Sequence, residues 1–313
     1  MYYITGDCHC DFSKIEWFCR FHKTSEDDVM ILLGDVGLNL TLDEVDVRRK
    51  EKVAQLPLTL FCVHGNHEAR PETILAYEER EWKGGTVFAE QEYPNILFAK
   101  DGEIYDFDGE RVLVIGGAYS VDKYYRLQVG LPWFADEQPS KETRECIEKK
   151  LEQNQWKVDY VLTHTCPRFM IPPEQMLRFV EQEAVDFSTE DWMERICKRL
   201  SFKKWYFGHF HDNRRYLDFE LLYEEIKELG MEDFLQRLGR PKYKLGEQVG
   251  FIFSDGEQEV ECYGKIEYAD RYGTMGQVKE VSYDIYGWDY LNQDAWVLYK
   301  HIAESNVWSL EKE

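Results

Sequence analysis

Histidine, aspartate and asparagine side chains follow five short apolar stretches of this sequence, and nitrogen and oxygen donors of these types hold metal ions in proteins. The stretches lead into the motifs GDCH, GDVG, GNHE, THT and GHFH. Five of the eight histidines of the chain belong to this set. An ordered series of this kind is much more specific than any one of its short motifs. The residues concerned are Asp7, His9, Asp35, Asn66, His67, His164, His209 and His211.

The apolar stretches predict the β-strands that position these side chains. They read YYIT, VMILL, LTLFCV, DYVLT and KWYF, and helical patterns such as residues 13–21 and 140–153 lie between them. This alternation predicts an α/β fold, in which sites form at the carboxyl ends of the strands. We therefore expect the polar side chains to meet at one edge of a sheet, where they can bind metal ions.

The five motifs, in this order and spacing, resemble the D-x-H, GD, GNH, H and G-H-x-H pattern of the calcineurin-like metallophosphoesterase superfamily. The resemblance covers about residues 1–229, which we take as the catalytic domain. It implies a four-layer α/β/β/α sandwich, in which two mixed sheets face each other and helices cover the outside. It also implies a two-metal centre that hydrolyses phosphate esters.

The resemblance assigns a role to each motif residue. One metal ion would bind Asp7, His9 and His211, the other would bind Asn66, His164 and His209, and Asp35 would bridge both. The ions would be divalent transition metals, with manganese favoured and iron, zinc, cobalt or nickel also suitable. A hydroxide bridging them would attack phosphorus. His67 would lie beside the substrate, where it can stabilise developing charge or protonate the leaving oxygen.

The second motif departs from the Ser/Thr phosphatase branch of this superfamily. That branch continues as GDxVDRG, whereas this chain reads GDVGLN, so that Leu38 replaces an aspartate that orients the catalytic histidine and Asn39 replaces an arginine that binds phosphate. A protein phosphatase of that branch is therefore disfavoured. Glu68 is a candidate for orienting His67, and a purely structural carboxylate is an equal alternative.

Substrate-binding residues are not assigned by the motifs. The stretch GGAYSVDKYYR, residues 116–126, offers cations that could meet phosphate, or it is an ordinary surface loop. If the first motif is extended, Cys8 and Cys10 point away from Asp7 and His9, because side chains alternate in an extended segment. A thiolate ligand at Cys10 is the alternative.

Composition limits the class of protein. The 313 residues include 38 Lys+Arg and 60 Asp+Glu, a formal net charge of −22, which makes tight binding of duplex nucleic acid unfavourable. No apolar run is long enough to span a membrane, and the start has no signal-peptide pattern. The eight cysteines form no CxxC pair. These features predict a cytoplasmic protein with reduced thiols.

The C-terminal part has a different pattern. The stretch RRYLDFELLYEEIKELG is expected to close the first domain with a strand and a helix. A linker is expected at 230–240, followed at 241–313 by closely spaced strands that predict a small β-barrel-like, SH3-like module. Asp255-Gly256 between two of these strands indicates a hairpin. The module is acidic, which favours a protein partner over nucleic acid.

Two functions fit these observations. The first is hydrolysis of small phosphomonoesters or phosphodiesters, including nucleotides or nucleic-acid ends. The second is a catalytically silent scaffold of the same fold that binds proteins through its β module. The complete ligand set favours the enzyme.

Overall fold

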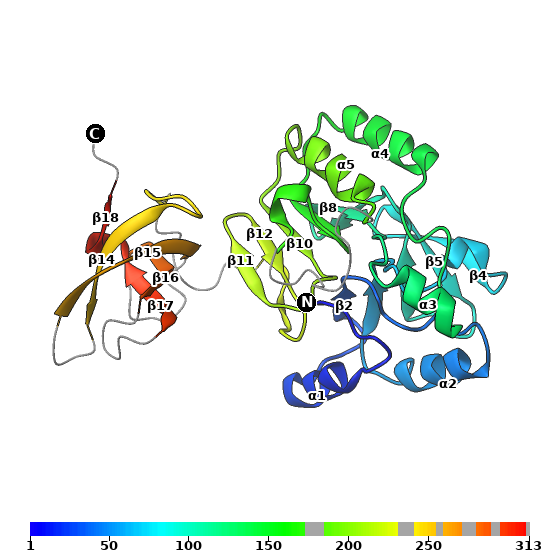
Figure 1. Cartoon of the computed structure of the whole chain (residues 1–313). Coiled ribbons are helices and arrows are strands. Elements are labelled where there is room, and N and C mark those ends of the chain that lie inside the picture. Colours follow the sequence, from blue (N-terminus) through cyan, green and yellow to red (C-terminus); the bar gives the residue numbers. More distant parts are fainter. Residues whose placement is uncertain (173–184, 231–240, 255–258, 271–279, 289–294, 311–313) are drawn as a thin grey trace. The chain divides into compact units, whose positions relative to one another are not determined.

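The computed structural model describes residues 1–172, 185–230, 241–254, 259–270, 280–288 and 295–310 (Figure 1). The chain divides into two compact units, Met1–Arg214 with Phe219–Gly230, and Arg215–Asp218 with Met231–Glu313. The expected linker at 230–240 lies almost entirely outside the described ranges, so the domain boundaries stay a prediction.

The first sheet has seven strands in the order β13-β1-β2-β3-β6-β5-β4. Strands β1, β2, β3 and β6 are parallel, so the ends of β1, β2 and β3 that carry the motifs lie at the same edge. β4, β5 and β13 pair antiparallel, which makes the sheet mixed. The strands are β1 (Tyr2–Thr5), β2 (Val29–Leu32), β3 (Thr59–Cys62), β4 (Tyr77–Trp82), β5 (Gly85–Glu90), β6 (Ile96–Ala99) and β13 (Lys227–Glu228).

The second sheet has six strands in the order β11-β12-β10-β9-β8-β7. Strands β8, β9, β10 and β12 are parallel, and β7 pairs antiparallel with β8. The motifs that follow β9 and β10 therefore also share an edge. The strands are β7 (Ile104–Phe107), β8 (Glu110–Ile115), β9 (Tyr160–Thr163), β10 (Lys204–Phe207), β11 (Arg214–Tyr216) and β12 (Phe219–Leu221).

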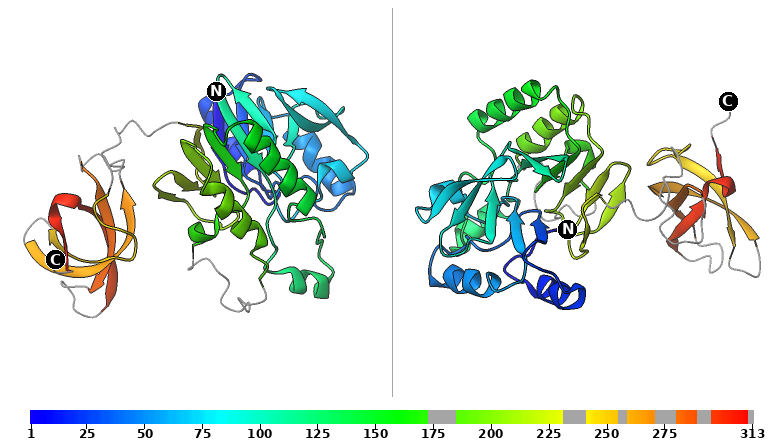
Figure 2. Two further views of the ribbon diagram at one scale, coloured as in Figure 1. Left: turned by 90° about the horizontal axis from the view of Figure 1, so that it is seen from above. Right: turned by 180° about the vertical axis from the view of Figure 1, so that it is seen from behind.

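Three apolar cores hold the layers together. One lies between the two sheets and joins side chains such as Phe61 of the first sheet to Tyr206 of the second. Another packs α1 (Ser13–His22) and α2 (Glu44–Val53) on the outer face of the first sheet. A third packs α4 (Lys141–Gln153) and α5 (Ser188–Cys197) on the second. The four-layer α/β/β/α sandwich is thus confirmed, with the sheets between two groups of helices in Figures 1 and 2.

The helices are short. The longest described one, α4, has 13 residues, and the side chain of Ser140 caps it by accepting a hydrogen bond from the amide of Thr143. The remaining α-helix, α3, covers Lys123–Val129, and short 3-10 turns occur at Pro71–Thr73, Arg168–Met170 and Glu304–Asn306. Within the described ranges, no helix has the length and apolar character that crossing a membrane requires.

The prediction of a helix within RRYLDFELLYEEIKELG is wrong. The end of this stretch forms β13, which pairs antiparallel with β1 through Tyr3↔Glu228 and Ile4↔Lys227. The ammonium of Lys227 also lies 2.7 Å from a carboxylate oxygen of the buried Glu220. Pairing with the edge of the sheet and this ion pair outweigh the local helix propensity of the segment.

The C-terminal module is a separate antiparallel sheet, as expected. Its strand order is β17-β16-β15-β14-β18, and it has its own core, which includes Phe251, Ile266 and Tyr283. The register Ser254↔Glu259 joins β14 to β15, while the turn expected at Asp255-Gly256 lies outside the described residues. The SH3-like topology stays a prediction. The strands are β14 (Gln248–Ser254), β15 (Glu259–Asp270), β16 (Ser282–Trp288), β17 (Trp296–Ala303) and β18 (Val307–Ser309).

Candidate metal centre

The loops after β1 and β10 bring together a first group of donors, Asp7, His9 and His211. The Nε2 atoms of His9 and His211 lie 3.6 Å and 3.4 Å from Oδ2 of Asp7 and 2.8 Å from each other. Oδ2 of Asp7 is buried and has no hydrogen-bond partner among the described residues. Two ring nitrogens that converge on an unsatisfied carboxylate oxygen form a site that suits a cation.

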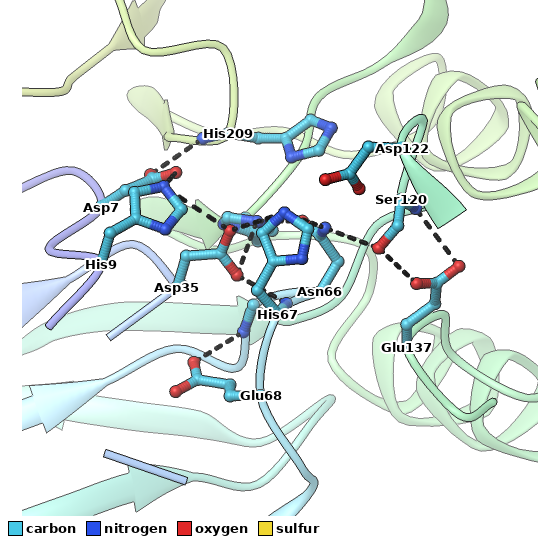
Figure 3. Close-up of polar contacts among 12 residues, drawn as sticks. Asp7, His9, Asp35, Asn66, His67, Glu68, Ser120, Asp122, Glu137 and His209 are labelled. Atoms are coloured by element: carbon cyan, nitrogen blue, oxygen red, sulfur yellow. Dashed lines mark hydrogen bonds and ion pairs between the residues drawn. The ribbon is translucent and has the colours of Figure 1, made fainter. Parts of the chain in front are cut away.

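The loops after β2, β3 and β9 form a second group beside the first (Figure 3). Nε2 of His164 lies 3.6 Å from Oδ1 of Asp35 and 2.8 Å from Oδ1 of Asn66. Donor atoms of Asp7, Asp35 and His164 all lie within 4.8 Å of one another. The two aspartates therefore stand between the groups, each within reach of histidines.

The hydrogen-bond directions around Asn66 fit a bound cation. Nδ1 of His164 lies 2.7 Å from the carbonyl oxygen of Leu33, which can only accept, so Nδ1 carries the proton and Nε2 has a lone pair. Asn66 donates through Nδ2 to Oγ of Ser120 at 2.9 Å, and Ser120 donates to Oε2 of Glu137 at 2.5 Å. Oδ1 of Asn66 thus faces Nε2 of His164 as a second acceptor. Two acceptors 2.8 Å apart repel each other unless a cation or proton lies with them.

The Asn66–Ser120–Glu137 row, visible in Figure 3, was not foreseen in the sequence. Ser120 and Glu137 are buried, and Glu137 also accepts hydrogen bonds from the amide of Ser120 at 3.2 Å and from Nε1 of Trp133 at 2.8 Å. Such outer hydrogen bonds fix the orientation of metal ligands. No local motif marks Glu137, because its role depends on a contact across the fold.

His209 packs against His164. Its backbone amide donates to Oδ1 of Asp7 at 3.0 Å, and its ring packs edge-on against His164 with centroids 4.9 Å apart. Burial, together with the nearby His164, lowers the pKa of His209 to about 3. The ring is therefore neutral at physiological pH, as a metal ligand must be. Its nitrogens belong to neither of the close donor groups that the described residues form.

His67 and Arg126 lie side by side next to the donor groups. Nε2 of His67 lies 3.3 Å from Nη2 of Arg126, and the amide of His67 donates to Oδ1 of Asp35 at 2.9 Å. Burial lowers the pKa of His67; the charge of Asp35 opposes this and that of Arg126 adds to it. Arg126 is held by hydrogen bonds to Asp122 and Pro132 at 2.8 Å and 3.2 Å. Of the two interpretations of residues 116–126, the structure favours the one that brings a cation to the site.

The side chain of Glu68 binds backbone amides rather than the ring of His67. Its buried carboxylate accepts hydrogen bonds from the amides of Val36, Gly37 and Gly65 at 3.3, 3.2 and 3.1 Å. Burial, with the charge of Asp35 adding to it, raises the pKa of Glu68 to about 8 even though these amides lower it. The geometry supports the structural alternative, in which Glu68 ties the loop after β2 to the loop after β3.

The two central aspartates are held as anions. Burial raises the pKa of Asp7, but the rings of His211 and His9, 3.4 Å and 3.6 Å from its Oδ2, outweigh this and leave the pKa well below its usual range. Burial likewise raises the pKa of Asp35, and the charges of His164 and His67 reverse the shift. Two buried carboxylates beside converging histidine nitrogens provide a negative centre that a divalent cation can neutralise.

Several motif residues adopt the left-handed backbone conformation, which is strained for residues other than glycine. Their φ angles are 46° for His9, 70° for Cys10, 45° for Asp35, 70° for His209 and 50° for His211. Strain of this kind concentrates at functional sites, where the surrounding fold enforces it. It also shows that the assumption of an extended first motif was wrong.

The two cysteines nevertheless point away from the donor groups. Cys8 is buried in the core beneath α1, where burial raises the pKa of its thiol to about 12. Sγ of Cys10 lies 3.5 Å from the carbonyl oxygen of Gly37, which accepts its hydrogen bond. Neither thiol joins a metal-binding group of the described residues.

The glycines of the motifs are needed for close approach. A Cβ atom on Gly34, whose φ is +98°, would lie 2.2 Å from Nδ1 of His164, and one on Gly208 would lie 2.3 Å from Oδ1 of Asp7. Any larger residue would displace a proposed ligand, so these glycines let the loops converge.

The residues that replace the phosphatase pair are structural. Leu38 is buried in the core beneath α1 and α2, and the side-chain oxygen of the buried Asn39 accepts a hydrogen bond from Tyr77 at 3.0 Å. Neither residue is available for the aspartate or arginine role of the Ser/Thr phosphatase branch.

The sheets, the outer helices and the Asp–His clusters at the strand ends together define a metallophosphoesterase fold with a candidate metal site. The profile of the calcineurin-like phosphoesterase family matches residues 2–213, and the chain belongs to this family. No curated protein matched the chain.

Solved structures show more distant similarity. A phosphopantetheinyl hydrolase from Mycobacterium tuberculosis is 15% identical with a TM-score of 0.39, over 71% of this chain and 87% of that one. A protein of unknown function from Aquifex aeolicus is 15% identical with a TM-score of 0.27, over 53% of this chain and 80% of that one. At these scores neither structure indicates a substrate for this chain.

Proposed function

We propose that this chain is a phosphoesterase that uses two divalent metal ions to hydrolyse small phosphomonoesters or phosphodiesters. The observation that carries the proposal is the convergence of possible metal-binding atoms at one edge of the sheets: Nε2 of His9 with Nε2 of His211, and Nε2 of His164 with Oδ1 of Asn66, each pair at 2.8 Å. A cation beside each pair would be held by both atoms of the pair.

The donor set determines how the ions would be held. Asp7, His9 and His211 would bind one ion. Asn66, His164 and His209, whose ring packs against His164, would bind the other, and Asp35 would bridge the two. Imidazole and carboxylate donors suit manganese, which we favour, and also iron, cobalt, nickel and zinc. Such a pair of ions supplies an activated water and neutralises phosphate charge.

The neighbouring residues would bind and orient the substrate. The guanidinium of Arg126, fixed by Asp122 and Pro132, is placed to donate to a phosphate oxygen with charge-assisted hydrogen bonds. His67, 3.3 Å from Arg126, would hydrogen-bond the same group or the leaving oxygen. Because the chain carries a strong net negative charge, binding of an anionic phosphate depends on such local positive charge. Nucleotides and nucleic-acid ends are candidate substrates, and the cytoplasm is the proposed location.

The alternative, a catalytically silent scaffold, would need neither these converging atoms nor Arg126 beside His67. The direct experiment is to strip the purified chain of metal, restore manganese, iron, cobalt, nickel or zinc singly, and measure hydrolysis of nitrophenyl phosphate and bis-nitrophenyl phosphate. We expect metal-dependent turnover of at least one ester. If no metal supports turnover of either ester, or of a panel of nucleotides, the enzyme proposal fails and the scaffold replaces it.

A further inference from the structure

The solvent-facing side of the C-terminal sheet carries a group of large apolar side chains among charged ones. Alternate residues of β15, β16 and β17 point into the module's core, and the residues between them are exposed. Five of the ten exposed positions carry large apolar side chains, which we call the aromatic face: Tyr263, Tyr286, Trp288, Trp296 and Leu298, with exposed fractions of 43%, 42%, 36%, 54% and 43%. An antiparallel sheet covered on one side usually shows polar residues on the other.

The aromatic face is contiguous. Trp288 lies directly opposite Trp296, and Tyr286 lies opposite Leu298, in the pairing of β16 with β17. The rings of Tyr286 and Trp296 stack with centroids 5.7 Å apart, and those of Trp288 and Trp296 meet edge-on at 6.1 Å. Tyr263 lies on the exposed side of the neighbouring strand, β15, which pairs with β16 through Gly264↔Gly287. Contiguous exposed apolar surface of this kind marks an interaction site.

The charges around this face select the kind of partner. Glu259 and Glu261 continue the exposed side of β15 beyond Tyr263. Lys265, which lies opposite Tyr286 in the pairing of β15 with β16, forms an ion pair with Glu267 at 2.6 Å, and Lys300 of β17 is a further exposed cation. Residues 241–313 as a whole contain seven Lys and Arg against fourteen Asp and Glu. Phosphate groups of nucleic acid or of anionic lipid are repelled by this balance.

We propose that the aromatic face binds a basic segment of another protein, with a lysine or arginine side chain over the indole and phenol rings. The faces of tryptophan and tyrosine rings attract cations, and the two adjacent glutamates add an attractive charge. The remaining apolar surface accommodates the aliphatic part of the basic side chain. The function of the module is then recruitment, independent of the chemistry at the metal centre.

The test is a binding measurement on the full chain. The probe is a short fluorescein-labelled peptide of alternating lysine and arginine, with the same peptide built from glutamine as the reference. Trp296→Ala is expected to weaken binding about fivefold to thirtyfold, because it removes one cation–ring interaction without any change in charge. The matched control is Trp17→Ala, which removes a tryptophan of α1 that is 63% exposed. Circular dichroism checks that both variants fold.

Each alternative result has a definite consequence. If Trp296→Ala binds the basic peptide as tightly as Trp17→Ala does, the attraction is only that of an acidic protein for a polycation, and the proposal is refuted. If the glutamine peptide binds equally well, no cation is recognised and the proposal is also wrong. If a neutral cello-oligosaccharide displaces the probe and Trp296→Ala abolishes its binding, the face is a carbohydrate site instead. None of these outcomes depends on catalytic turnover.

Discussion

Replacing Ser120 with alanine is expected to weaken the binding of one of the two proposed metal ions selectively. The hydroxyl of Ser120 accepts a hydrogen bond from Nδ2 of Asn66 at 2.9 Å and donates one to Glu137 at 2.5 Å. This direction keeps the amide oxygen of Asn66 towards His164. Without the hydroxyl, the amide can turn and donate to Nε2 of His164, which stabilises the metal-free state and withdraws a ligand.

The size of the effect follows from the two hydrogen bonds that the Ser120 hydroxyl makes. Hydrogen bonds that orient metal ligands are typically worth about tenfold to a hundredfold in metal affinity. Glu137 would also have one donor fewer than its present three, which costs about 0.5–1.5 kcal/mol of folding stability, because its buried oxygen keeps the hydrogen bond from Trp133 and is not left without a donor. The protein should therefore remain folded while its second ion binds more weakly.

The assay is a titration of the metal-free chain with manganese against a competing chelator, which resolves two affinities. Ser120→Ala should lower one affinity about tenfold to a hundredfold and leave the other within about twofold. The control, Ser201→Ala, removes an exposed hydroxyl of the same unit and should change neither. Unchanged affinities would refute the orienting role of Ser120, and an equal loss at both sites would show a general structural defect.

Four further expectations follow from the same geometry. Asp35→Asn should lose far more activity than Cys10→Ala; loss of a metal ion in Cys10→Ala would make that thiol a ligand. His67→Ala should keep both ions, by mass spectrometry, while turnover falls about a hundredfold to ten-thousandfold, most for alkyl leaving groups that need a proton. Arg126→Gln should raise the KM for a nitrophenyl ester about tenfold to a hundredfold, as removal of a charge-assisted hydrogen bond requires; an unchanged KM would remove Arg126 from the substrate. A chain that ends at Gly239 should fold and hydrolyse small esters, and loss of folding would show that the C-terminal module is part of one core.

The strands and the meeting of the motifs could be predicted because both depend on local signals. VMIL and KWYF are continuous apolar or buried runs typical of interior parallel strands, and all four residues of each are buried. Parallel pairing then places the residues after them at one edge. The proposed ligands are recognisable for the same reason, since each follows its strand within a few residues.

Interactions between distant segments could not be predicted. Glu137 supports Asn66 through Ser120, although 71 residues separate Glu137 from Asn66 in the sequence. The segment that forms β13 has the composition of a helix, and only its pairing with β1 makes it a strand. The left-handed φ of His9 was also hidden, because non-glycine residues adopt it only when the surrounding fold compels them.

The most direct test of the central claim is the number and separation of bound metal ions. The purified chain, loaded with manganese and freed of excess, is measured by metal analysis and by electron paramagnetic resonance. A two-ion centre predicts two equivalents per chain and an exchange-coupled signal from ions about 4 Å apart. One equivalent, or two that behave as isolated ions, would contradict the dinuclear centre that the donor groups around Asp7 and Asp35 are proposed to hold.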